Sequence, residues 1–155
     1  MIVVGYTAGA FGRACLAEGI AQARVHDAEL LVISAVSEAR GQRIADANEI
    51  AWVERQLEQS GLRWRLTQPI GGTPAEELLA AMDDPAAIML VIGMRRRTQV
   101  GKLLLGSTSQ YLLVECRKPV LVVKPGDDHR RPPVSPASPV DEAAELPWSG
   151  SEIEP

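Results

Sequence analysis

The sequence predicts an α/β protein built on an open, five-stranded parallel sheet with helices on both faces. Short, β-branched apolar runs alternate along the chain with longer segments in which apolar residues recur at helical spacing. With 155 residues, 46% of them hydrophobic and 23% charged, the chain is long and apolar enough for one real core. No apolar run approaches the roughly 20 residues that cross a bilayer, so we expect no membrane partner.

The first half of the chain supplies three strands and two helices. The run from Ile2 to Tyr6 is continuous and apolar, which is typical of a strand buried on both faces. A second run of this kind begins at Leu30 and continues to about Val36. The third strand alternates in polarity, which indicates a sheet edge. The predicted elements are strands over 2–6, 30–36 and 62–67, and helices over 12–24 and 43–60, the second ending before Gly61.

The second half adds two helices and two strands around a basic segment. Thr73, Pro74 and Glu76 form a helix start in which the threonine and the glutamate cap each other. That helix stops at 83–85, where a proline follows two aspartates. A strand over 88–92, a helix that begins at Gly106 and a strand over 119–123 complete the pattern. Because strands alternate with helices throughout, right-handed crossovers should place helices on both faces.

A candidate binding site lies where the fourth strand runs into a basic segment and then a helix. The strand ends at Gly93, and Gly106 leads Ser107 and Thr108 into the last helix. Unpaired N–H groups at a helix N-terminus favour an anion. In an open parallel sheet, ligands bind beyond the carboxyl ends of the strands where the strand order reverses. Thr7, Val36 and Gly93 should therefore line one crevice, with apolar walls for a base and N–H groups and arginines for phosphates.

The segment GMRRRTQVGKLLLGSTSQ, followed by KPVLVVK, resembles the C-terminal half of a universal stress protein domain. The order and spacing of the elements resemble that family over residues 1–124. Family members that bind ATP carry a glycine, two residues, a glycine, nine residues, a glycine and then Ser or Thr. Here Gly93 fills the first position, and Gly106 with Ser107 fills the last after the correct gap. The resemblance implies a Rossmann-like, adenine nucleotide alpha hydrolase-like fold with strand order 3-2-1-4-5.

Two positions depart from the family pattern. Arg96 replaces the middle glycine, and Thr7 stands where nucleotide binders of the family usually place an Asp that holds the adenosine part. Val36 corresponds to the family position whose backbone meets the adenine. Arginine does not freely replace a glycine that a phosphate approaches closely or that has positive φ. Arginine also brings a charge and a fork of donors suited to phosphate, so phosphate binding and a solvated basic surface both remain open.

The last strand predicts a subunit contact. Val120, Leu121, Val122 and Val123 are all apolar, and the final strand should lie at an edge of the sheet. An exposed apolar edge is a liability unless it is paired or covered. Pairing with a second copy across a two-fold axis would cover it. The family that the chain resembles dimerises through this strand, so we expect a homodimer.

The composition changes after Lys124, which divides the chain into a domain over 1–125 and a tail over 126–155. Six of the 30 tail residues are Pro, and few apolar residues are available to offset the entropy of ordering, which predicts disorder. Seven acidic residues and two arginines give the tail a net charge of −5, so the first 125 residues carry +1 of the overall −4. Such a nearly neutral domain gives no indication of a nucleic-acid surface.

Dedicated catalysis is not expected. No general base or metal-carboxylate pair can be placed at the phosphates, although slow ATP hydrolysis is left open. Cys15 and Cys116 have no disulfide or metal spacing, and we interpret them as reduced core thiols of a cytoplasmic protein. His26 and His129 are expected to be exposed and incidental.

Two function hypotheses follow. The first is a dimeric stress-response regulator that binds ATP, with or without Mg, or another adenine nucleotide as a regulatory ligand. The second is a nucleotide-free dimeric interaction module of the same fold, whose dimer surface and acidic tail contact an unknown protein partner. The hypotheses diverge at Arg96 and Thr7, which either accommodate a nucleotide or prevent its binding.

Overall fold

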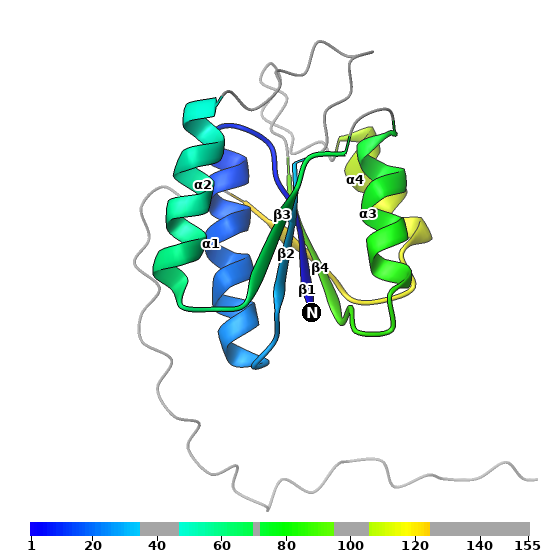
Figure 1. The fold of residues 1–155 in the computed structure, drawn as a ribbon. Helices are drawn as coiled ribbons and strands as arrows, with labels where there is room; N and C mark the ends of the chain where they lie inside the picture. The colour runs from blue at the N-terminus through cyan, green and yellow to red at the C-terminus, as the bar shows by residue number, and fades with distance from the viewer. Residues whose placement is uncertain (35–46, 70–71, 95–105, 125–155) are drawn as a thin grey trace, which may run out of the picture. The chain divides into compact units, whose positions relative to one another are not determined.

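The computed structural model describes residues 1–34, 47–69, 72–94 and 106–124. They form a five-stranded, wholly parallel sheet in the order β3-β2-β1-β4-β5 (Figure 1), which confirms the predicted fold class and strand order. The central strands are short and apolar, as parallel strands buried on both faces must be, whereas β3 alternates in polarity. The strands are β1 (Ile2–Gly5), β2 (Leu30–Ile33), β3 (Trp64–Thr67), β4 (Met89–Gly93) and β5 (Val120–Val123).

Helices cover both faces of the sheet. Figure 1 shows α1 (Ala10–Val25) and α2 (Ala47–Ser60) on one face, and α3 (Pro74–Asp83) and α4 (Ser107–Glu115) on the other. The predicted capping box opens α3, because Thr73 accepts from the Glu76 backbone N–H while the Glu76 carboxylate accepts from the Thr73 N–H. Among the residues that the structure describes, no helix is both long enough and apolar enough to cross a membrane.

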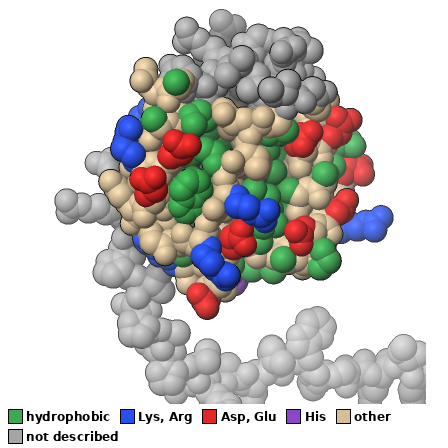
Figure 2. Space-filling model, in the orientation of Figure 1, with side chains coloured by type: hydrophobic (Ala, Val, Ile, Leu, Met, Phe, Trp, Pro, Cys, Tyr) green, Lys and Arg blue, Asp and Glu red, His purple; other side chains and the backbone are tan. Residues whose placement is uncertain are grey.

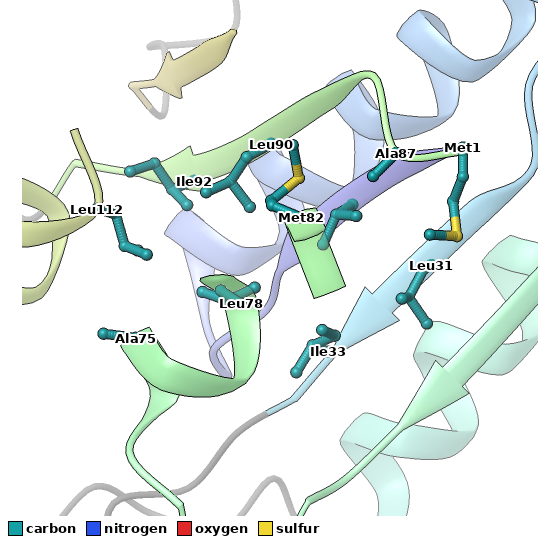
Figure 3. Packing of buried hydrophobic residues seen from close by; sticks show 11 residues of the cluster. Met1, Leu31, Ile33, Ala75, Leu78, Met82, Ala87, Leu90, Ile92 and Leu112 are labelled. Carbon is teal, nitrogen blue, oxygen red and sulfur yellow. The ribbon is translucent and has the colours of Figure 1, made fainter. Parts of the chain in front are cut away.

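The core has one layer on each side of the sheet, because alternate residues of each strand point to opposite faces. On the α1 and α2 side, Val4, Val32 and Val91 pack with Leu16 and Leu57. The other layer joins strand residues to α3 and α4; Figure 3 shows Leu78 and Met82 of α3 beside Leu90 and Ile92 of β4, with Leu112 of α4 close by. The two buried layers hold the sheet between its helices, and the carboxyl ends of the strands lie beyond these layers.

Two bounds of the predicted strands are wrong. β2 ends at Ile33, with Ser34 already outside the strand, and so stops before the predicted Val36. β3 begins at Trp64 and not at residue 62, because Gly61 turns the chain at φ 69° and the Leu62 N–H is bonded to Ser60 Oγ at 3.2 Å. Leu62 therefore belongs to the turn and only packs at the margin of the core. In α2, Ala47 is exposed at the first position, and Val53 and Leu57 are the buried residues.

The face seen in Figure 2 carries charged side chains of both signs, and several acidic ones lie together on its right, over α3. Arg65 of β3, for example, forms an ion pair with Glu29, with Nε and Oε1 2.8 Å apart.

β3 and β5 are the two edges of the sheet. The predicted edge positions of both strands are thus confirmed. The predicted tail over 126–155 lies outside the described residues.

Candidate functional site

The carboxyl ends of β1 and β4 and the N-terminus of α4 form the candidate site. We call it the strand-end site and define it by Thr7, Gly93, Gly106, Ser107 and Thr108. β1 and β4 are neighbours with Val4 opposite Val91, so Thr7 and Gly93 follow at the same edge of the sheet. Thr7 is exposed. The order of the strands reverses between β1 and β4, which is where open α/β sheets bind ligands.

A side-chain contact joins the first turn of α4 to the end of β4. Ser109 Oγ donates a hydrogen bond to the Gly93 carbonyl oxygen at 3.2 Å. The Met94 N–H continues the sheet by donating to Val123 at 3.0 Å. Gly93 and the start of α4 are therefore brought together, as the sequence predicts, although the intervening residues 95–105 lie outside the described part.

Gly93 has a packing reason to be glycine. A Cβ at this position would lie 3.2 Å from Cys15 Sγ and 3.5 Å from Phe11 Cβ, so even an alanine would fit tightly against α1. Cys15 is buried, and burial raises the pKa of its thiol to about 12. It is a protonated core thiol, as the sequence predicts.

Gly106 differs from Gly93 because neither its packing nor its conformation requires a glycine. Gly106 is the N-cap of α4 with φ −64° and ψ 150°, which every residue type adopts, and a Cβ there would meet no atom of the described residues within 4 Å. Within the described ranges, no side-chain hydrogen bond caps α4 at this residue. The Gln110 N–H donates to the Gly106 carbonyl at 2.9 Å and so begins the helix. The backbone N–H groups and the dipole at this helix start favour an anion.

The turn between β1 and α1 is held in one shape by close packing. A Cβ on Gly12 would lie 1.8 Å from the Thr7 carbonyl oxygen, so only glycine lets α1 start this close to the strand end. Gly9, the N-cap of α1, has φ 107°, a conformation that favours glycine. The position of Thr7 is therefore fixed by two glycines that follow it.

A polar cluster beside this turn escaped the sequence analysis. The Glu49 carboxylate, from the first turn of α2, accepts hydrogen bonds from Tyr6 Oη, from the Gly9 N–H at 3.4 Å and from Arg13 Nε at 3.4 Å. Arg13 Nη2 lies 3.0 Å from the second carboxylate oxygen, and the guanidinium also stacks 4.8 Å above the Trp52 ring. We call these four side chains, Tyr6, Arg13, Glu49 and Trp52, the Glu49 cluster.

Hydrogen bonds from Arg13 and Tyr6 lower the pKa of Glu49 to about 2, so this carboxylate is charged at neutral pH. Burial, reinforced by the neighbouring carboxylate, raises the pKa of Tyr6 above its ordinary value, so the phenol stays protonated and donates. The one sequence signal was Tyr6 itself, because a tyrosine that ends a buried strand needs a partner for its hydroxyl. The partner is 43 residues away in the chain, beyond the reach of local patterns.

Two predicted site residues, Val36 and Arg96, lie outside the described residues. The other predicted binding residues come from the ends of β1 and β4 and from the start of α4, which meet at one edge of the sheet. Comparison with known proteins identifies this arrangement, because residues 1–124 match the universal stress protein family. The chain belongs to the universal stress protein family. A universal stress protein of Mycolicibacterium smegmatis is 52% identical over 127 residues, which are 81% of this chain and 98% of that protein.

Solved structures of universal stress proteins share the fold. The protein from Archaeoglobus fulgidus in complex with dAMP superposes with a TM-score of 0.59 at 20% identity, over 79% of this chain and 96% of that one. A universal stress protein in complex with cAMP gives a TM-score of 0.60 at 21% identity, over 81% of this chain and 96% of that one. At this level of identity the likeness establishes the architecture of the sheet and helices.

Proposed function

We propose that this universal stress protein binds an adenine nucleotide at the strand-end site as a regulatory ligand. The observation that carries the proposal is the N-terminus of α4 at the strand ends, where Gly106 is the N-cap and no described atom would lie within 4 Å of a Cβ on it. Phosphate oxygens bind well at such a helix start, because the backbone N–H groups and the helix dipole both favour a negative group.

The neighbouring residues suit the rest of a nucleotide. Thr7 is exposed at the end of β1, where its hydroxyl can hydrogen-bond a sugar or a base. Ser107 and Thr108 place two further hydroxyls in the first turn of α4, beside the expected phosphates. Two proteins of the same fold hold adenine nucleotides, dAMP in one and cAMP in the other, which supports an adenine-containing ligand. For this chain we propose ATP, with or without Mg.

Regulation is the proposed role of the nucleotide. The ligand would contact residues from β1, β4 and α4, so binding would tie these elements together and change the surface offered to a partner protein. The alternative, a nucleotide-free interaction module, predicts that the same surface works without a ligand. The two differ in one measurable property, the affinity of the purified chain for nucleotide.

Calorimetric titration of the full chain with Mg-ATP, ADP and AMP tests the proposal. We expect micromolar binding, and Ser107→Ala should weaken it about tenfold because a hydrogen bond to a charged phosphate is lost. Ser60→Ala is the matched control. Ser60 Oγ donates to the Leu57 carbonyl at the C-terminal end of α2, outside the strand-end site, so losing this hydroxyl should leave nucleotide affinity unchanged. No heat up to millimolar nucleotide from a folded chain would contradict the proposal and favour the interaction module.

We also propose that β5 pairs with its copy in a homodimer. All four residues, Val120–Val123, are only half-buried at the edge of the sheet. Leu121→Lys should therefore shift the chain toward a monomer in sedimentation velocity. Leu66→Lys in β3, a half-buried leucine on the other edge, is the control that should leave the assembly unchanged. Equal sedimentation of both variants and the unmodified chain would contradict a β5 interface.

A further inference from the structure

Two helices, α1 and α4, begin at the same edge of the sheet, immediately beyond neighbouring strands β1 and β4. Each helix N-terminus favours a negative group. A nucleotide lying across the strand ends therefore has two candidate positions for its phosphates. The structure treats these two positions differently, and the difference lies in the Glu49 cluster.

A carboxylate already occupies the N-terminus of α1. Glu49 reaches from α2 to accept from the Gly9 N–H at the N-cap of α1, and both of its oxygens bond Arg13 one turn further on. The Tyr6 hydroxyl, just after the end of β1, also donates a hydrogen bond to this carboxylate. Glu49 is largely covered, with 14% of its side chain exposed, whereas 51% of the Arg13 side chain is exposed.

We propose that Glu49 sets the orientation of the bound nucleotide, by excluding phosphates from the N-terminus of α1 and leaving them the N-terminus of α4. The inference rests on the proposed function and adds a specificity-determining residue to it. Glu49 occupies the N–H group and the guanidinium that would otherwise attract a phosphate. Its own charge also repels a phosphate that approaches them.

Removing the carboxylate should create a second anion site. In Glu49→Ala, Arg13 and the start of α1 become available, so we expect sodium tripolyphosphate to bind at least about tenfold more tightly than to the unmodified chain. Because Arg13 stacks on Trp52, the new site should change tryptophan fluorescence, and Trp52→Phe in the same background should remove that change. Adding Arg13→Ala should cancel the gain in affinity.

The chain offers a matched control. Glu29 pairs with Arg65 Nε at 2.8 Å, an ion pair of the same kind in which the glutamate directly precedes β2, away from any helix N-terminus. Glu29→Ala also releases an arginine, yet it should leave tripolyphosphate affinity unchanged. If Glu29→Ala gains as much tripolyphosphate affinity as Glu49→Ala, then any arginine released from an ion pair is enough to bind the anion, and the inference is wrong.

Three outcomes separate the inference from the proposed function. A folded Glu49→Ala chain that binds tripolyphosphate no better than the unmodified chain overturns the inference, whatever ATP does. If Glu49→Ala does not fold, Glu49→Gln replaces it, because the amide oxygen can still accept from Tyr6 and Gly9 while the charge that pairs with Arg13 and repels phosphate is removed. Unchanged tripolyphosphate affinity in a folded Glu49→Gln chain would overturn exclusion by the Glu49 charge. An unmodified chain that binds no ATP overturns the proposed function, whereas a gain in Glu49→Ala would still identify Glu49 as the group that closes α1 to phosphate.

Discussion

The N-termini of α3 and α4 differ in which groups cap their unpaired backbone N–H groups. At α3, Thr73 and Glu76 cap each other, with Glu76 Oε2 3.0 Å from the Thr73 nitrogen and Thr73 Oγ1 3.3 Å from the Glu76 nitrogen. The hydrogen bonds from Thr73 lower the pKa of Glu76, so the carboxylate stays charged beside the helix start. At α4, the N-cap is a glycine with no side chain to cap the helix, and no described atom would lie within 4 Å of a Cβ there.

The difference separates a structural helix start from one that can serve a ligand. A carboxylate from the helix itself stabilises α3 permanently. Leaving α4 with a glycine forgoes part of that stabilisation, roughly a few tenths of a kcal/mol. Such a loss is tolerated where a ligand supplies the missing negative group, and α4 begins at the edge of the sheet where ligands of this architecture bind.

The largest expected effect comes from giving α4 the kind of cap that α3 has. Gly106→Asp fits the observed φ and ψ, so it should raise the melting temperature while it weakens ATP binding at least about 100-fold, because a carboxylate would occupy the phosphate position and repel the phosphate. Gly106→Asn is the control, with the same size and capping ability but no charge, and it should lose far less affinity. Thermal unfolding and calorimetric titration measure both properties; full ATP affinity in Gly106→Asp would place the phosphates elsewhere.

The opposite change, at α3, should affect stability alone. Thr73→Ala removes the hydroxyl that accepts from the Glu76 N–H, and loss of such a cap costs about 1 kcal/mol of unfolding free energy. ATP affinity should remain that of the unmodified chain, because α3 starts outside the strand-end site. Urea unfolding followed by circular dichroism gives the first quantity and titration the second. A parallel loss of affinity would mean that the two helix starts are not independent.

The smallest effect concerns pH and the third helix start, at α1. The pKa of Glu49 falls from an ordinary 4.5 to about 2 on folding. Its contribution to stability is therefore complete above pH 4.5 and is lost as the pH falls through about 2. Solvent screening limits this contribution to about 1 kcal/mol or less. Urea unfolding at several pH values should show a shallower acid loss in Glu49→Gln; identical pH profiles would exclude Glu49 as a source of the acid dependence.

Local patterns predicted most of the fold, because strand burial, helical periodicity and the capping box at Thr73 depend on residues close together in the chain. The same holds for the edge positions of β3 and β5. The start of β3 was missed because a side chain, Ser60, redirects the backbone after Gly61. This competition between a side-chain acceptor and the strand ladder is decided by the turn geometry and not by the alternation of residues.

The candidate site was predictable only in part. Gly93, Gly106 and Ser107 are visible as a spaced motif, and the structure brings them to one edge of the sheet. The Glu49 cluster was not predictable, because Arg13 and Glu49 are 36 residues apart and meet only when α1 and α2 pack together. That Gly106 has open space around it, whereas Gly93 does not, also depends on neighbours that no local pattern reveals.

The packing of Cys15 against Gly93 makes the labelling rate of this thiol a measure of local opening at the end of β4. The thiol is 1% exposed, so a disulfide reagent reaches it only when α1 separates from the end of β4. Its rate of labelling is then the intrinsic thiol rate scaled by the population of the open state, which yields an opening free energy for this edge of the sheet. Cys116 is less buried and supplies the faster reference reaction in the same molecule. A ligand that bridges β1, β4 and α4 would slow the first reaction and spare the second.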